Sequence, residues 1–323
     1  MRRLAACAFF CALLARGATA PAPPASVVPV VSSRPVVLRV ATYNVRNYVS
    51  TDRMVDGKYN PNWPKPEAEK TALRAVIRQA HPDILALEEM GTAPYLEELR
   101  RDLATEGLDY PYSTLVLGPD PDRHVALLSR VPLAQTHSRE NISFKLGGAT
   151  ELVKRGLLEA DFVTNGQVWS LYVVHLKSRL TEIASDPESA AEREGEARTL
   201  RDLIRQEHTL TAGTGTAAPE LVAVVGDFND AKDAPTLQRF LELNAKPLFL
   251  AAAAVDSRGE TWTLYYPKAD QYEHSDYILL SPALAPLQKN KGGIIDGPDS
   301  LRASDHRLVW VDLTFPPPPA AKP

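Results

Sequence analysis

A run of apolar residues at positions 221–225 constrains the fold of this chain most, because its valine-rich composition indicates a β-strand. Gly-Asp-Phe-Asn follows it directly at residues 226–229, and a second polar group, Ser-Asp-His at residues 304–306, stands beside another β-type run. Either group alone is weak evidence, since Asp and Asn often cap turns. Together they predict one metal-dependent site for phosphoester hydrolysis, which needs a hard cation, a group that activates water and donors for phosphate oxygens.

Strand-like segments outnumber helix-like ones and include hairpin-like neighbours. This order predicts an α/β fold of stacked mixed sheets flanked by helices, and it disfavours a purely parallel sheet. We expect strands at residues 36–45, 83–90, 113–117, 125–129, 157–163, 168–176, 221–225, 277–280 and 308–313, and helices at 65–80, 94–104 and 190–207. The last helix alternates charges at helical spacing, which predicts a solvent-exposed helix.

The N-terminus has the pattern of a secretory signal peptide. Two arginines precede an apolar stretch that is too short for a membrane span, and a small-residue cleavage site ends near Ala20. We therefore expect a signal peptide at 1–20, a Pro/Ala-rich linker at 21–35, one catalytic domain at 36–315 and a Pro-rich tail at 316–323. An uncleaved anchor is the alternative. The prediction is an exported protein, periplasmic or extracellular, with no stable membrane insertion.

Both cysteines, Cys7 and Cys11, lie in the predicted signal peptide, so the mature protein would have no disulfide. Removing the three arginines of that segment shifts the formal charge from -4 to -7. A mildly acidic protein is not built for nonspecific nucleic-acid affinity, which depends on Lys and Arg, although local basic patches remain compatible with this charge.

Five further motifs occur in order with the first two: Thr-Tyr-Asn at 42–44, Asp-Ile-Leu-Ala-Leu-Glu-Glu at 83–89, Arg-Gly-Leu-Leu at 155–158, His-Leu-Lys-Ser at 175–178 and Asp-Tyr-Ile-Leu at 276–279. This series resembles the endonuclease/exonuclease/phosphatase family of DNase I-like proteins over nearly the whole predicted domain. The resemblance implies a four-layer α/β sandwich with two central mixed β-sheets. It also implies phosphoester hydrolysis with Mg²⁺ or Mn²⁺.

By this resemblance, Asn44, Glu89 and Asp305 are metal-site residues. The family usually has Gln then Glu at the second position, so Glu88 takes the Gln place. Strand alternation sends neighbouring side chains to opposite faces, so one of the two glutamates is expected to bind the ion. We assign Glu89, with Glu88 as the alternative. A carboxylate suits Mg²⁺, which prefers oxygen ligands.

The resemblance also implies the catalytic residues. Asp227 would orient or deprotonate the attacking water, and Asn229 would bind a phosphate oxygen; the alternative for this pair is an Asx turn. An imidazole titrates near neutrality, so His306 is the acid-base candidate, held in its tautomer by Asp276.

Two further groups would contact the scissile phosphate. His175 matches the second family histidine, although a core histidine is the alternative. Arg155 fits the cationic donor, because its planar fork suits phosphate oxygens, although Lys154 could share the task. The chain departs from the family at His274-Ser275, where Arg-Ile is common, which puts substrate contacts there in doubt.

The resulting hypothesis is an exported, divalent-metal-dependent nuclease or phosphodiesterase that acts as a monomer on nucleic acid or another phosphodiester substrate. The alternatives are a sphingomyelinase- or inositol-phosphate-phosphatase-like hydrolase and a catalytically silent binding protein of the same fold. Trp63, Tyr265 and Tyr266 could stack on bases or touch a lipid surface.

Overall fold

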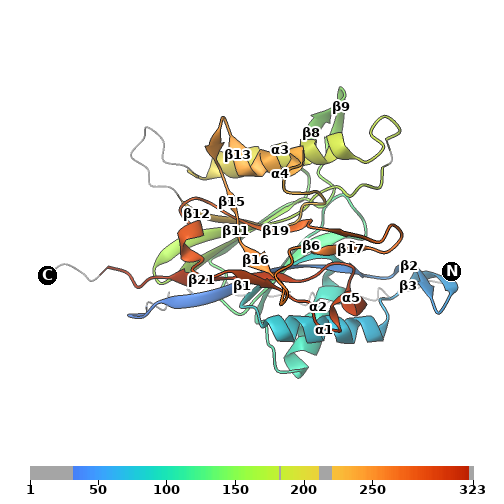
Figure 1. Ribbon diagram of the computed structural model, residues 1–323, viewed down its shortest axis with the longest axis horizontal. Coiled ribbons are helices and arrows are strands. Elements are labelled where there is room, and N and C mark those ends of the chain that lie inside the picture. Colours follow the sequence, from blue (N-terminus) through green and yellow to red (C-terminus); the bar gives the residue numbers. More distant parts are fainter. Residues whose placement is uncertain (1–31, 182, 211–219, 320–323) are drawn as a thin grey trace, which may run out of the picture.

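Two mixed β-sheets lie face to face at the centre of the computed structural model, which describes residues 32–181, 183–210 and 220–319 (Figure 1). The first sheet has the order β16 (Ala254–Val255), β20 (Gly292–Ile294), β21 (Val309–Phe315), β1 (Val36–Tyr48), β4 (Ile84–Met90), β6 (His124–Ser129) and β5 (Tyr112–Val116). The second has the order β15 (Leu250–Ala251), β19 (Asp276–Leu280), β12 (Leu221–Asp227), β11 (Gln167–His175), β10 (Leu157–Thr164) and β7 (Gln135–Arg139).

Helices cover the outer face of each sheet and complete four layers. In Figure 1, α1 (Glu67–Ala80), α2 (Ala93–Thr105) and α5 (Ser300–Ala303) lie below the first sheet, and α3 (Ala190–Glu207) and α4 (Pro235–Leu241) lie above the second. A short 3₁₀ helix, η1, spans Ala285–Leu287. The predicted four-layer α/β sandwich with two mixed sheets is confirmed.

Strand alternation explains why each sheet packs on both faces. In β12, Ala223 and Val225 belong to the core between the two sheets. Val222 and Val224 face the other way, into the core beneath α3 and α4. The first sheet divides its residues likewise between the central core and the core beneath α1 and α2. Apolar residues on both faces therefore fix each sheet between two layers.

Four two-stranded hairpins project from the sandwich. They are β2 (Thr51–Val55) with β3 (Lys58–Trp63), β8 (Ser143–Leu146) with β9 (Ala149–Leu152), β13 (Glu242–Leu243) with β14 (Lys246–Pro247), and β17 (Leu264–Tyr266) with β18 (Gln271–Glu273). The sequence analysis missed all four, because polar residues occupy both faces of these strands and hide the period of two.

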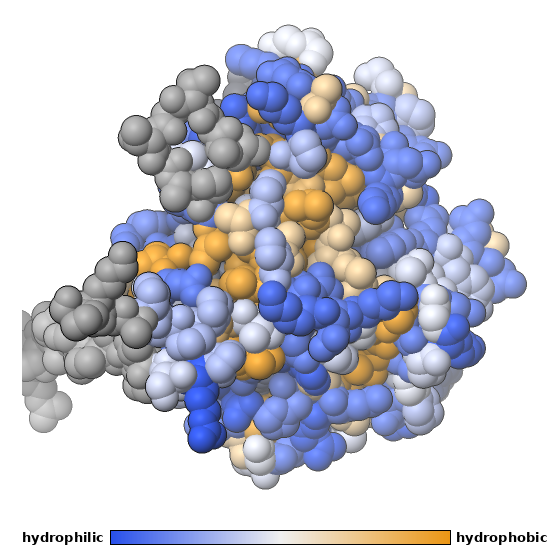
Figure 2. Space-filling view, turned by 60° about the vertical axis from the view of Figure 1, so that its left-hand side comes forward, coloured by the Kyte–Doolittle hydropathy of each residue, from blue (hydrophilic) through white to orange (hydrophobic). Residues whose placement is uncertain are grey.

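Figure 2 shows a band of apolar residues across the face turned forward, with hydrophilic residues above and below it.

The prediction of a solvent-exposed helix at 190–207 was right about its bounds and wrong about its environment. One face of α3 is buried and includes Arg193 and Glu196. The Glu196 carboxylate accepts hydrogen bonds from the backbone N–H groups of Lys154, at 2.9 Å, and Lys177, at 2.7 Å. Buried charges with partners look like a solvated face in the sequence alone.

The predicted signal peptide and most of the linker lie outside the described residues. Residues 316–319 of the predicted tail form neither helix nor strand. Within the described part of the chain, no helix is long and apolar enough to cross a membrane.

Candidate active site

Strand direction gathers the motif residues at one end of the two sheets. β1 and β4 run parallel, and so do β11 and β12, so each pair ends at the same edge. β21 and β19 run antiparallel to them and begin where they end. Motifs far apart in the sequence therefore meet: Asn44 from β1, Glu88 and Glu89 from β4, His175 from β11, Asp227 from β12, Asp276 from β19, and Asp305 and His306 just before β21.

Asp227 is the centre of this group. Its Oδ2 accepts hydrogen bonds from Nδ2 of Asn44, at 3.0 Å, and of Asn229, at 3.2 Å. The same oxygen lies 3.7 Å from Nε2 of His175 and 3.8 Å from Nε2 of His306. The backbone N–H of Asn229 donates to Oδ1 at 2.8 Å, so an Asx turn does form, but it is part of the cluster.

Gly226 allows the close approach that places Asp227 beside His175. Its φ is 142°, and a Cβ there would stand 1.9 Å from the carbonyl oxygen of Val174 on β11. An L-residue would therefore both strain this backbone and push the two strands apart. The glycine lets β12 lie against β11 up to the residue that bears the carboxylate.

His306 and Asp276 form a hydrogen-bonded pair. Nδ1 of His306 lies 2.9 Å from Oδ2 of Asp276, which leaves Nε2 toward Asp227. Thr263 Oγ1 accepts the backbone N–H of Asp276 at 3.1 Å, and Ser304 Oγ accepts that of His306 at 3.1 Å. The structure thus brings together His306 and Asp276, and the role of Asp276 in holding the imidazole in its tautomer stays a prediction.

The two histidines have opposite charge preferences. Burial alone would lower the pKa of His306, but Asp276 and Asp227 outweigh it and raise that pKa well above its ordinary value. Burial, reinforced by Arg155 and His306, holds the pKa of His175 well below its ordinary value. The surroundings therefore favour the protonated form of His306 and the neutral form of His175. Burial also raises the pKa of Asp227 to about 7, although His306 acts in the other direction.

Arg155 provides a buried, partly unpaired guanidinium. One nitrogen, Nη2, lies 3.2 Å from Oδ2 of Asp120, which the sequence analysis did not single out. Among the described residues, Nε and Nη1 of Arg155 have no hydrogen-bond partner, and neither does Nδ1 of His175. Buried donors without partners are rare in folded proteins, and a bound anion would satisfy those of the guanidinium.

Glu88 and Glu89 occupy different environments. Glu88 is fully buried, its Oε1 accepts from Thr42 Oγ1 at 2.7 Å, and burial raises its pKa well above the ordinary value. Glu89 is half-buried, with a φ of 59°, and its Oε2 accepts the backbone N–H of Asn47 at 2.8 Å. The positive φ interrupts the strand alternation on which the choice between the two was based.

The oxygen ligands expected at a Mg²⁺ or Mn²⁺ site are present. Asp305 is half-buried, with Oδ2 3.5 Å from Nε of Arg46, and Oδ1 of Asn44 accepts the backbone N–H of Arg46 at 3.0 Å. Among the described residues, the buried Oε2 of Glu88 has no partner. Hard carboxylate and amide oxygens fit such an ion. The assignment of Asn44, Glu89 and Asp305 as its ligands stays a prediction.

A second grouping of potential ligands lies next to the first, because Asn44 donates a hydrogen bond to Asp227. Asp227, Asp276 and His306 each offer an atom, all within 4.8 Å of one another. His306, however, already uses Nδ1 toward Asp276, and the same contact occupies the Asp276 carboxylate. We therefore regard these three as acid-base groups beside a metal position.

The fold and this arrangement define a DNase I-like α/β sandwich with a carboxylate- and imidazole-rich site at one end of its sheets. The sequence profile of the "Endonuclease/Exonuclease/phosphatase family" matches residues 41–306, and this chain belongs to that family. Members of the family are typically metal-dependent hydrolases of phosphoesters. Among curated proteins, no match was found.

Solved structures similar to this chain share its fold at low sequence identity. The human Nocturnin catalytic domain with bound sulfate is 18% identical, with a TM-score of 0.57, over 86% of this chain and 94% of that one. A Staphylococcus aureus beta toxin mutant with bound magnesium ions is 16% identical, with a TM-score of 0.59, over 87% and 100%. Sphingomyelinase C from Streptomyces griseocarneus is 15% identical, with a TM-score of 0.57, over 86% and 99%.

Proposed function

We propose that this protein is an exported phosphodiesterase that depends on Mg²⁺ or Mn²⁺, with nucleic acid as its substrate. The observation that supports it best is the buried group of Asp227, His306 and Asp276, together with the buried, partly unpaired guanidinium of Arg155. Water activation, proton transfer and anion stabilisation are the three tasks of phosphodiester hydrolysis, and this group offers one side chain for each.

The proposed roles follow from charge and position. Asp227 accepts the proton of the attacking water, because a pKa of about 7 matches a general base to neutral pH. His306, kept protonated by Asp276, donates a charge-assisted hydrogen bond to the phosphoryl group. His175, Asn229 and Arg155 hold the phosphoryl oxygens.

A bound ion would be held by Glu89, Asp305 and Asn44, and it would neutralise charge that develops on the phosphoryl group. Glu89 and Asp305 are both half-buried, which suits Mg²⁺ because this ion retains several waters. Glu88 is the alternative ligand. Its burial and raised pKa favour the protonated carboxyl, which is a poorer metal ligand than a carboxylate.

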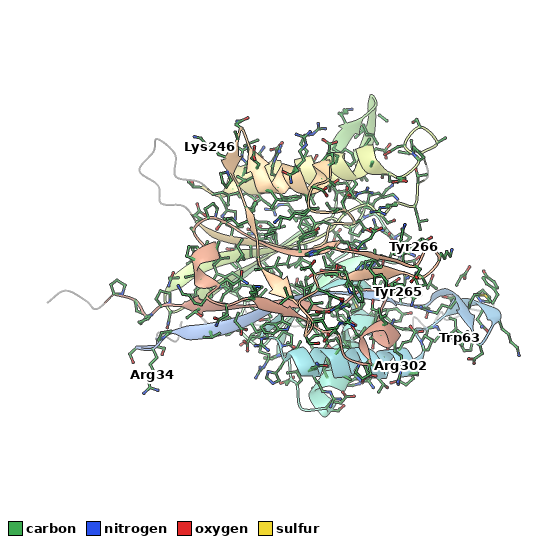
Figure 3. The ribbon with its side chains drawn as sticks, viewed as in Figure 1. Arg34, Trp63, Lys246, Tyr265, Tyr266 and Arg302 are labelled. Atoms are coloured by element: carbon green, nitrogen blue, oxygen red, sulfur yellow. The ribbon has the colours of Figure 1, made fainter. Side chains whose placement is uncertain are left out.

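A lipid- or inositol-phosphate hydrolase is the second candidate, supported by exposed aromatic residues near the site. Trp63, on β3, is 45% exposed and Tyr266, on β17, is 46% exposed. Figure 3 places Trp63, Tyr265 and Tyr266 at the same end of the molecule. These rings could contact a lipid surface as readily as nucleic-acid bases.

The deciding experiment is nicking of supercoiled plasmid DNA by purified residues 21–323 with Mg²⁺ or Mn²⁺. The controls are EDTA and the shape-conserving variants Asp227→Asn and His306→Gln. Nicking that disappears in all three controls supports the nuclease. Turnover of sphingomyelin or an inositol phosphate without nicking would support the second candidate function for the same site. No turnover of any phosphoester would indicate a binding protein.

Export and the monomeric state are part of the proposal. Cell fractionation of the full chain, followed by mass spectrometry of the mature N-terminus, tests cleavage near Ala20. Light scattering of the purified protein tests the monomer. A product that keeps residues 1–20 would favour the uncleaved anchor.

A further inference from the structure

A cavity of about 290 Å³ lies beside the candidate active site. Its walls are the end of β1, the β2–β3 hairpin, the start of α1 and the segment before β6. Three guanidinium groups line it, from Arg46, Arg53 and Arg123. We call this cavity the arginine pocket.

The arginine pocket adjoins the predicted metal residues. Nε of Arg46 lies 3.5 Å from Oδ2 of Asp305. Asn47, which also lines the pocket, donates its backbone N–H to Glu89 at 2.8 Å. A group bound in the pocket would therefore sit next to a phosphate bound at the site.

The guanidinium groups are only partly neutralised by protein carboxylates. Arg46 has Asp305 as its ion-pair partner at 3.5 Å, and Arg123 has Asp120 at 3.9 Å. Arg53 donates Nε to the carbonyl oxygen of Trp63 at 3.2 Å and Nη2 to backbone carbonyls of 47 and 49. Among the described residues, Nη1 of Arg53 makes no hydrogen bond.

The acidic residues of the pocket wall are engaged elsewhere. Asp52 accepts from Tyr59 Oη at 2.5 Å and from the backbone N–H of Asn62 at 3.0 Å. Glu69 accepts from Nζ of Lys65 at 3.0 Å, and this lysine side chain is fully buried. The residues that line the pocket carry three positive and two negative charges, an excess of one positive charge in a protein whose net charge is -4.

Strained backbone holds one of these arginines in place. Arg46 and Asn47 have φ values of 46° and 50°, which cost free energy for residues other than glycine. Strained backbone at a concave, charged surface is a feature typical of a ligand site.

We propose that the arginine pocket binds a second phosphate of the substrate, next to the one that is hydrolysed. This inference rests on the proposed function and narrows it to substrates with neighbouring phosphates, either a polynucleotide backbone or an inositol polyphosphate. Arginine forks bind phosphate oxygens bidentately, and three of them disfavour the cationic choline headgroup of sphingomyelin.

Arg123→Gln is the variant that tests the pocket, because the ion-pair partner of Arg123 is Asp120, whereas Arg46 pairs with Asp305 and Arg53 donates to backbone carbonyls. Arg123→Lys conserves the charge. Arg302→Gln is the matched control: Arg302 is exposed at the same end of the molecule, on α5, outside the pocket (Figure 3). Binding of a fluorescein-labelled 12-nucleotide single strand is measured in EDTA from 25 to 200 mM NaCl. Inositol hexakisphosphate serves as the competitor.

We expect Arg123→Gln to weaken oligonucleotide or inositol hexakisphosphate binding about five- to tenfold at low salt. For the oligonucleotide, the slope of log affinity against log salt should shrink by about 0.7, the value for one phosphate contact on a single strand. Arg123→Lys should keep most of the slope. If Arg123→Gln weakens the binding of only one of the two ligands, that ligand is identified as the source of the second phosphate.

Equal affinities and slopes for Arg123→Gln, Arg302→Gln and the unaltered protein would overturn the proposal, as would failure of both ligands to bind. Hydrolysis of bis(p-nitrophenyl) phosphate, which has one phosphate, is measured in parallel. If the unaltered protein does not hydrolyse this compound but its binding of the ligands depends on Arg123, the proposed hydrolase is rejected and the proposed pocket is retained.

Discussion

The charge of His306 depends on its carboxylate neighbours. Burial alone would lower the pKa of this imidazole, but Asp276 and Asp227 raise it, whereas burial lowers the pKa of His175, whose Nε2 lies 3.7 Å from Oδ2 of Asp227. Two residues of one type thus differ in charge because their surroundings differ. The sequence shows both histidines but does not show that their pKa values shift in opposite directions.

Replacing Asp276 with Asn should lower the pKa of His306, because the nearest carboxylate that raises it is removed. We expect the turnover number to fall roughly 10²-fold or more, in line with the loss of oriented general acid-base catalysis. Histidine Cε1–H NMR titration measures the pKa, with His306→Gln to assign the signal. An unchanged titration would show that Asp276 does not control this imidazole.

The choice between Glu88 and Glu89 is a second question at this scale. Mg²⁺ should raise the melting temperature of the unaltered protein, because an ion that binds only the folded state stabilises it by mass action. Glu89→Gln should remove most of this shift, and Glu88→Gln should retain it, since a protonated Glu88 resembles Gln. Differential scanning fluorimetry with and without 5 mM Mg²⁺ measures both. The reverse pattern would make Glu88 the ligand.

The close pairing of β11 with β12 depends on one residue, Gly226. Val174 lies opposite Gly226 and His175 opposite Asp227 in the parallel register. The sequence predicts both strands, because their apolar runs are long. It does not predict which strands are neighbours, and it misses the polar hairpins, whose short strands have no clear alternation.

Gly226→Ala should destabilise the fold by more than about 3 kcal/mol, since the new Cβ meets a backbone carbonyl that cannot move independently of β11. Gly57→Ala is the control: Gly57 also has a positive φ, 73°, but no atom lies within 4 Å of the new Cβ. That change should cost about 1 kcal/mol. Urea unfolding compares the two, and equal losses would mean that the close contact is unimportant.

A second charged cluster joins β10 to the end of α3. Burial would raise the pKa of Glu159, but His208, whose Nε2 lies 3.8 Å from Oε1, and hydrogen bonds from Tyr172 and Arg139 lower it to about 2. Burial would lower the pKa of His208, but Glu159 and Glu220 outweigh it and raise that pKa above its ordinary value. The Glu159 contribution to stability is therefore complete above its ordinary pKa of 4.5 and disappears as the pH falls toward 2. The His208 contribution is complete below 6.5 and declines as the pH rises.

Glu159→Gln should accordingly cost roughly 2 to 3 kcal/mol at pH 6, and the difference from the unaltered protein should shrink as the pH is lowered below 4.5. Glu140→Gln, at an exposed position near the same sheet edge, should cost less than about 0.5 kcal/mol. Urea unfolding at several pH values measures both. A pH-independent loss would show that Glu159 acts through packing alone.

At the scale of the whole molecule, the sandwich brings together strand ends that are far apart in the chain. Asn44 and Asp227 are 183 residues apart and are joined by a 3.0 Å hydrogen bond. The resemblance of the motif series to a known family was sufficient to predict the four layers, and the structure brings the residues of those motifs to one end of the sheets. It could not predict the arginine pocket, because Arg53 belongs to a hairpin whose position follows from tertiary packing.

The left-handed backbone at Arg46, Glu89 and Asn229 has a consequence for how such a protein could change over time. Each of these strand-end residues holds a functional side chain in a conformation that costs roughly 1 kcal/mol and that glycine would adopt freely. Selection for heat resistance alone would therefore favour glycine at these positions and remove the site. A laboratory library of variants screened only for survival at high temperature should yield proteins that keep the fold and are stable but have no activity. Stability and activity must therefore be selected together in this protein.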